Sequence, residues 1–248
     1  MNRATVLRLD LLDGLALHQQ DLQGRDLPMP DLPHGVQRLV AFVALSGRPG
    51  RSAVAGSLWP EASELQARRN LRTALWRAQK LVPGLVTTVG GAVALHDHVR
   101  VDVRELTAWG RRLLVPGAPI GDGSTAHPAL HGELLPGWYD DWVLLERERL
   151  RQLRMHAWEA LSEKLVRAGR YGEAVEAAHE AIRAEPLRES AHVSLIRAHA
   201  AEDNIGEALL AYHRFEQRLA GELGLAPSQH LTAMVRGLGR TPVGYRHG

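Results

Sequence analysis

The feature that most constrains the fold is a short repeat in the C-terminal half of the sequence. Residues 170–174 (Arg-Tyr-Gly-Glu-Ala) are echoed by residues 204–208 (Asn-Ile-Gly-Glu-Ala), which begin 34 residues later. A period of 34 residues is that of the tetratricopeptide repeat, in which each repeat is a pair of helices. Because one such pair cannot bury its apolar face alone, the repeat predicts a stack of helix pairs.

Other positions in this half also fit the repeat. Small residues are expected where paired helices approach closely, and larger ones fill the groove between them. In the first repeat, counted from Met155, the matching residues are Trp158, Leu161, Gly169, Tyr171, Ala174, Ala181 and Pro186. In the second, weaker repeat they are Leu195, Ala208 and Tyr212. The region from residue 102 onward is therefore expected to be all helical.

The N-terminal part has a different pattern, in which short strands precede helices. Residues 6–11 alternate apolar and polar side chains, and Asp13-Gly14 predicts a turn to a second strand. Residues 22–30 are expected to add further short strands. Together these segments predict a small sheet.

Three helices and a hairpin follow the sheet. Apolar residues at helical spacing predict a helix over about 34–46 and a shorter one from an N-cap at Ser52 to Pro60. After the third helix, residues 85–95 predict a hairpin with a two-glycine turn. This order is that of a winged helix-turn-helix domain. The expected fold is thus an α+β winged-helix domain followed by an all-α tetratricopeptide-like domain.

The third predicted helix, residues 67–82, has one apolar and one basic face. The apolar residues are Leu71, Leu75, Ala78 and Val82. The opposite side carries Arg69, Arg72, Thr73, Trp76, Arg77 and Lys80. No Asp or Glu lies between residues 64 and 97, so nothing in the local sequence neutralises these charges. Such a helix suits the DNA major groove, whereas the alternative is an amphipathic helix with a solvated basic face.

Within this helix, Arg77 is the first candidate for reading bases, because Arg donates two hydrogen bonds to guanine O6 and N7. Arg72 and Thr73 are the next candidates. Trp76 has two open interpretations, contact with a thymine methyl group or sugar and packing over the helix surface.

A second set of residues is expected to hold DNA phosphates. Arg69 and Lys80 are candidates on the same helix, and Arg51 is a candidate at the start of the preceding one. Thr87 and Thr88 of the hairpin are candidates as well, although strand propensity explains them equally.

No pattern in the sequence indicates catalysis, a cofactor or a metal. Cysteine is absent, which excludes disulfides, thiolate zinc sites and a Cys nucleophile. His96 and His98 share a strand face, but no third metal ligand is evident. There is no phosphate-binding glycine loop, zinc-protease helix motif or nucleophile elbow. We therefore expect no enzyme, no cofactor and no metal site.

The distribution of charged and apolar residues predicts both the partners of the chain and its cellular compartment. The net charge of +2 is unevenly divided, since the first 104 residues are net positive and the rest net negative. A basic domain joined to a slightly acidic one fits DNA binding followed by protein interaction. The N-terminus lacks the apolar run of a signal peptide, and no run is long enough to span a membrane. The expectation is a soluble cytoplasmic protein associated with the nucleoid.

The chain resembles the SARP family (Streptomyces antibiotic regulatory proteins), which pairs an OmpR-type DNA-binding domain with a bacterial transcriptional activation domain. The N-terminal motifs are residues 37–39 (Gln-Arg-Leu), 58–60 (Leu-Trp-Pro) and 67–68 (Ala-Arg). The C-terminal motifs are residues 134–138 (Leu-Leu-Pro-Gly-Trp), 142–149, 185–189 (Glu-Pro-Leu-Arg-Glu) and 222–228. Unlike the family's usual wing, residues 91–94 carry neither an aromatic nor a basic residue. The resemblance implies domains at 1–101 and 102–248.

The resemblance also implies a function and partners. A SARP-like chain would be a sequence-specific transcriptional activator, for a secondary-metabolite or pathway-specific gene cluster. Two protomers would bind direct repeats in promoter DNA about one helical turn apart. The loop at 60–66, with Glu61 and Glu64, would contact RNA polymerase near its sigma subunit.

A competing hypothesis is a tetratricopeptide-type scaffold that binds a protein or peptide, with the basic helix serving structure alone. Salt dependence separates the two. A DNA binder that neutralises several phosphates loses affinity steeply as salt rises, whereas a groove built on packing does not.

Overall fold

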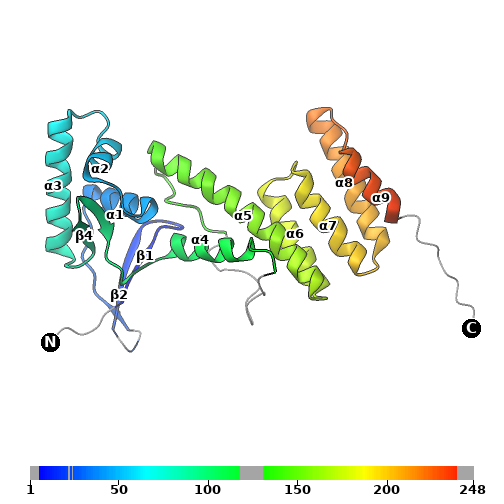
Figure 1. Ribbon diagram of the computed structural model, residues 1–248, viewed down its shortest axis with the longest axis horizontal. Coiled ribbons are helices and arrows are strands. Elements are labelled where there is room, and N and C mark those ends of the chain that lie inside the picture. The colour runs from blue at the N-terminus through cyan, green and yellow to red at the C-terminus, as the bar shows by residue number, and fades with distance from the viewer. Residues whose placement is uncertain (1–5, 22, 24, 118–130, 239–248) are drawn as a thin grey trace, which may run out of the picture. The chain divides into compact units, whose positions relative to one another are not determined.

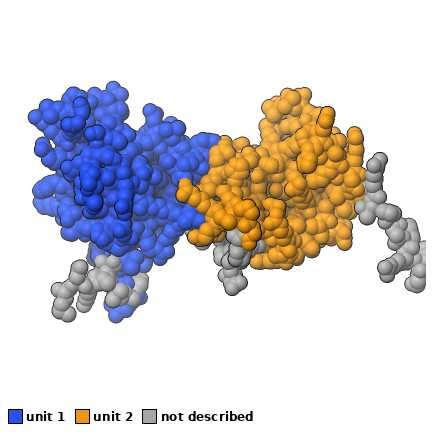
Figure 2. Space-filling model, in the orientation of Figure 1, with its two compact units in different colours: residues 1–108, 127–150 blue, residues 109–126, 151–248 orange. Residues whose placement is uncertain are grey.

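A computed structural model describes residues 6–21, 23, 25–117 and 131–238 (Figure 1). The chain forms two compact units (Figure 2): residues 1–108 with 127–150, and residues 109–126 with 151–248. The first unit includes residues 127–150 because this later segment packs onto it. The proline and glycine residues between positions 116 and 130 predict an exposed loop there, and most of this segment lies outside the described residues.

The first unit contains a four-stranded sheet. Its strands are β1 (Val6–Asp10), β2 (Ala16–Gln20), β3 (Asp26–Leu27) and β6 (Val99–Val101), in the order β3-β2-β1-β6. β1 pairs antiparallel with β2, as the Asp13-Gly14 turn predicts, and parallel with β6. Leu7 and Leu9 are buried while Arg8 between them is exposed, which confirms the predicted alternation. β6 was not predicted.

Three helices and a hairpin complete the winged helix. They are α1 (His34–Ser46), α2 (Arg51–Leu58), α3 (Glu64–Leu81), β4 (Val86–Val89) and β5 (Ala92–Leu95). α1 has the predicted bounds. The predicted two-glycine turn is also confirmed, since Gly90 and Gly91 have φ of 58° and 82°, which favour glycine.

Two helix starts differ from the prediction. α2 begins at Arg51 after Gly50, and no side chain caps it, so Ser52 is a helical residue rather than the N-cap. α3 begins at Glu64, three residues earlier than expected. The reason is Ser63, whose hydroxyl accepts a hydrogen bond from the backbone N–H of Gln66 at 3.3 Å.

A later segment, residues 131–150, completes the first unit. The backbone N–H of Leu135 donates to the Leu11 carbonyl at 2.8 Å. Arg38 of α1 forms an ion pair with Asp140, and the Trp142 ring meets the Phe42 ring edge-on at 5.4 Å. Through these contacts the segment covers α1 and the end of β1.

The buried carboxylate of Asp102 ties the sheet to the next helix, α4 (Asp102–Leu113). It accepts hydrogen bonds from the backbone N–H groups of Leu11 and Leu12 at 2.9 Å and of Val103 at 2.6 Å. Burial raises the pKa of this carboxyl, although the three donors oppose that shift.

The second unit is built of helices. They are the C-terminal part of α5 (Asp141–Arg167), α6 (Tyr171–Ala184), α7 (Glu189–Ala201), α8 (Ile205–Leu223) and α9 (Gln229–Leu238). Ala174, Ala181 and Ala208 are fully buried. The hydroxyl of Ser162 donates to the Ala174 carbonyl at 2.9 Å, which shows how closely α5 and α6 approach. The predicted stack of helix pairs is confirmed.

Candidate nucleic-acid interface

α3 presents one long face of the first unit. Its buried residues Ala67, Leu71, Ala74 and Ala78 recur at helical spacing and face the rest of the unit. In Figure 1, α1, α2 and β4 all lie on the same side of α3. The opposite side of the helix is therefore free within this unit.

The predicted basic residues form a single stripe along this free side. All six residues, Arg69, Arg72, Thr73, Trp76, Arg77 and Lys80, are exposed. Successive turns of the helix contribute these residues, at positions three or four apart. The stripe spans residues 69–80 and is therefore about 16 Å long.

The arginines of the stripe are not neutralised. Among the described residues, the side chains of Arg69, Arg72 and Arg77 make no hydrogen bond or ion pair. By contrast Arg68, which lies off the stripe, pairs with Glu64 at 2.5 Å. Unpaired guanidinium groups in a row on an exposed helix face can bind the phosphates of DNA and the edges of its bases.

Trp76 stands at the centre of the stripe. Its side chain is 60% exposed, which is high for a residue with so large an apolar surface. The Nζ atom of Lys80 lies 5.1 Å from the centroid of the Trp76 ring, a cation–π arrangement. More than half of the indole surface is therefore exposed, and Lys80 lies over one part of it.

Thr73 is less available than its neighbours. Its hydroxyl donates to the Arg69 carbonyl at 3.1 Å, one helical turn back. The hydroxyl proton is therefore used within the helix, and the oxygen remains as an acceptor.

The hairpin β4–β5 is the wing of the winged helix, and its turn contacts Arg51, the first residue of α2. The Arg51 backbone N–H donates to the Gly91 carbonyl at 3.2 Å, and that of Val93 donates to the Pro49 carbonyl at 2.9 Å. Thr88 is exposed and Thr87 half-buried. Val89, the last residue of β4 before the turn, is 70% exposed. The strands β4 and β5 carry no charged side chain, and Arg51 of α2 contacts the turn through its backbone.

The stripe also extends beyond the predicted residues. Leu65 and Gln66 belong to the helix, are exposed, and lie on the same side one turn before Arg69. Sequence reasoning missed them because it placed residues 60–66 in a loop. Ser63 followed three residues later by Gln66 is a capping-box pattern that could have revealed the earlier start.

Two residues, Glu61 and Glu64, were expected to contact RNA polymerase. Glu61 is exposed and lies three residues before the first residue of α3. Glu64 is in the first turn of α3, where a carboxylate favours the positive end of the helix dipole, and it pairs with Arg68. Glu64 is therefore a helical residue rather than a loop residue, and its ion pair with Arg68 is exposed.

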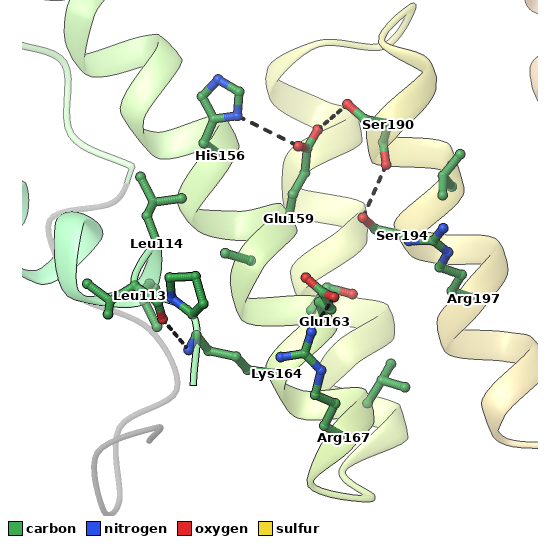
Figure 3. A pocket seen from close by; sticks show the side chains of 16 residues that line it. Leu113, Leu114, His156, Glu159, Glu163, Lys164, Arg167, Ser190, Ser194 and Arg197 are labelled. Atoms are coloured by element: carbon green, nitrogen blue, oxygen red, sulfur yellow. Dashed lines mark hydrogen bonds and ion pairs between the residues drawn. The ribbon is translucent and has the colours of Figure 1, made fainter. Parts of the chain in front are cut away.

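A separate groove of about 660 Å³ lies in the second unit, lined by the end of α4, by α5 and by α7 (Figure 3). Its charged groups are largely bound within the unit. The Glu159 carboxylate accepts from Ser190 at 2.6 Å and from Arg188 at 2.9 Å. The Lys164 ammonium donates to the Val115 carbonyl at 3.1 Å. Arg197 has no hydrogen bond or ion pair in the described part of the chain.

Other site types find little support in the described residues. They contain no group of three His, Asp or Glu side chains that could hold a metal ion. His96 and His98 do approach each other, with their Nδ1 atoms 2.7 Å apart, on the exposed turn between β5 and β6. None of the described helices is long and apolar enough to cross a membrane.

His192 is a buried histidine of α7. It is 6% exposed, stacks on the Phe215 ring at 4.1 Å, and donates from Nε2 to the Pro186 carbonyl at 2.9 Å. Burial lowers the pKa of His192, and the nearby Arg218 adds to this shift. The ring is therefore neutral in the folded protein near neutral pH.

This histidine makes the second unit sensitive to acid. The unfolded chain takes up the proton near the ordinary pKa, above the folded value, so the free energy of unfolding falls as the pH drops through about 6.5. In His192→Gln, whose amide can still donate to Pro186, we expect a weaker dependence. Urea unfolding at several pH values measures it, with exposed His230→Gln as control. An unchanged pH dependence in His192→Gln would contradict the assignment.

The geometry defines a class of protein: a winged-helix regulator with an exposed basic helix, joined to tetratricopeptide-like helix pairs. The family model described as "Bacterial transcriptional activator domain" matches residues 101–238, more than half of the chain. The chain belongs to this family, and the winged helix that precedes the domain gives it the SARP-type organisation.

A solved structure supports the same fold. The structure of Mycobacterium tuberculosis EmbR in complex with a low affinity phosphopeptide is similar to 96% of this chain, with a TM-score of 0.71 and 21% sequence identity. The chain spans 66% of the length of that EmbR chain. No curated protein matches the sequence.

Proposed function

We propose that the chain is a sequence-specific DNA-binding transcriptional activator whose α3 enters the major groove. The observation that carries this proposal is the stripe of unpaired arginines on the exposed face of α3, with Trp76 at its centre. Membership of a transcriptional activator family supports it.

The residues of the stripe are assigned to two kinds of contact with DNA, those with bases and those with the backbone. Arg77 and Arg72 are assigned to base edges, where each guanidinium can bind guanine through two hydrogen bonds. Trp76 is assigned to a thymine methyl group or a sugar. Arg69, Lys80 and Arg51 are assigned to phosphates, which fix the position of the helix on DNA. Thr73 and the wing threonines Thr87 and Thr88 are assigned weaker contacts as acceptors or donors.

The partners follow from the SARP-type organisation. Two protomers bind direct repeats in promoter DNA about one helical turn apart, as a homodimer on DNA. Glu61 and Glu64 lie at the start of α3, and this edge is assigned to RNA polymerase near its sigma subunit. The regulated genes are assigned to a pathway-specific or secondary-metabolite cluster.

In vitro selection from random double-stranded DNA tests the proposal. The expected result is a motif that recurs as a direct repeat. If each of two protomers holds three phosphates, log K should fall with log [salt] with a slope of about −5. Anisotropy titrations between low and physiological salt measure this slope. Failure to enrich any motif with folded protein would overturn sequence-specific binding.

The groove between α5 and α7 favours a second candidate, a scaffold that binds a protein or peptide. Its volume of about 660 Å³ and the unpartnered Arg197 support a ligand there. On this hypothesis DNA binding is weak and without sequence preference, and a partner is retained at high salt.

A further inference from the structure

A second cavity in the helical unit has features that the proposed function does not use. It measures about 610 Å³ and is lined by α6, α7 and α8. None of the residues that line the groove between α5 and α7 lines this cavity. Its volume lies within the range of small-molecule sites.

The cavity is apolar in the middle and polar at both ends. Ile182, Leu195 and Ala211 contribute its apolar surface. His192 and His199 of α7 lie seven residues apart on one helix face, so they mark positions about 10 Å apart along the cavity. A ligand that reaches both ends is therefore elongated.

One end of the cavity is cationic. Arg214 lines it and makes no hydrogen bond or ion pair with any described residue. Arg218, one turn further along α8, has only a long ion pair with Glu222, at 3.7 Å. Arg218 also lowers the pKa of His192, behind the effect of burial, which shows that its charge acts at this end.

The other end is polar and carries one carboxylate, that of Glu207. The Nδ1 atom of His199 is buried and has no hydrogen-bond partner. Burial lowers the pKa of His199, and Glu207, the one carboxylate that lines the cavity, opposes this shift. His179 of α6 also lines the cavity and acts electrostatically on both α7 histidines.

We propose that this cavity binds a small organic carboxylate with an elongated apolar body. The carboxylate pairs with Arg214 and Arg218, which the chain leaves without a close acceptor. The apolar body contacts Ile182, Leu195 and Ala211. A polar group at the far end of the ligand, where present, is placed beside His199 and Glu207. This makes the helical unit a receptor for a small molecule, independent of whether α3 binds DNA.

Titration of the full chain with sodium octanoate, and separately with 1-octanol, tests the proposal. Octanoate has the required charge and a length of about 10 Å, the spacing of the two histidines. We expect octanoate to shift the imidazole NMR signals of His179, His192 and His199. The neutral alcohol should bind about tenfold more weakly, because it lacks the charge-assisted hydrogen bonds.

Variants connect the effect to the cationic end. Arg214→Gln with Arg218→Gln should weaken octanoate binding about tenfold and leave octanol binding unchanged. Arg236→Gln, which removes an exposed charge on α9, is the matched control and should bind as the wild type does. Thermal unfolding confirms that the variants are folded.

Three results would overturn the proposal: no shift up to about 10 mM octanoate, equal affinity for octanoate and octanol, or wild-type affinity in the double variant. Because the assay contains no DNA, none of these results bears on the proposed function.

Discussion

Replacing Arg72 and Arg77 together by alanine is expected to lower the affinity for the selected operator about 100-fold. Each bidentate contact with a base contributes about 1–3 kcal/mol. Both side chains are exposed and have no partner in the described structure, so the variant should fold normally. Fluorescence anisotropy at one fixed salt concentration measures the change, since affinities for DNA compare only at equal salt.

The matched control for this experiment is Arg68→Ala. Arg68 is on the same helix and also exposed, but it lies off the stripe and is paired with Glu64. Removing it deletes one charge from α3 without deleting a proposed base contact. The expected loss is small and equal for operator and random DNA. If the Arg72/Arg77 variant behaved like this control, base readout would have to be assigned to other residues.

Replacing Asp102 by alanine is expected to destabilise the first unit by about 3 kcal/mol. The change leaves the backbone N–H groups of Leu11, Leu12 and Val103 without their acceptor, and a buried unsatisfied donor costs about 1–3 kcal/mol. Urea unfolding followed by tryptophan fluorescence measures the loss, because Trp59, Trp76, Trp138 and Trp142 all lie in this unit.

Two further variants make this test specific. Asp102→Asn keeps a side-chain oxygen that can accept from Leu11 and Leu12, so its loss should be clearly smaller. Asp97→Ala removes an exposed carboxylate whose ion pair with Arg48 is 3.5 Å long, and it should change stability by less than about 1 kcal/mol. Equal losses in Asp102→Ala and Asp102→Asn would show that the hydrogen bonds are not the cause.

Much of the fold follows from local patterns in the sequence. The bounds of α1 and the two-glycine turn of the hairpin were predictable because each depends on residues close together in the chain. The helix pairs were predictable because the period of 34 residues repeats the same packing positions. The face of α3 was predictable for the same reason, since Leu71 and Ala78 recur at helical spacing.

What the sequence did not predict depends on distant partners. β6 has three residues and no alternation long enough to detect, and it is a strand because β1 offers a free edge. The return of residues 131–150 to α1 depends on pairs such as Arg38 and Asp140, which are 102 positions apart. The cavity residue Arg214 is an ordinary surface-pattern residue in the sequence, and only the packing of three helices brings it to the cavity.

The return of residues 131–150 also determines when the first unit can finish folding during synthesis. Domains at the N-terminus usually fold as soon as they leave the ribosome. Here Leu11 directly after β1 and the Phe42 ring find their partners Leu135 and Trp142 only after at least one hundred further residues have been made. The nascent winged helix therefore completes its core only after α4 and the start of α5 have emerged. A ribosome that stalls before residue 150 therefore holds a first unit whose core is incomplete.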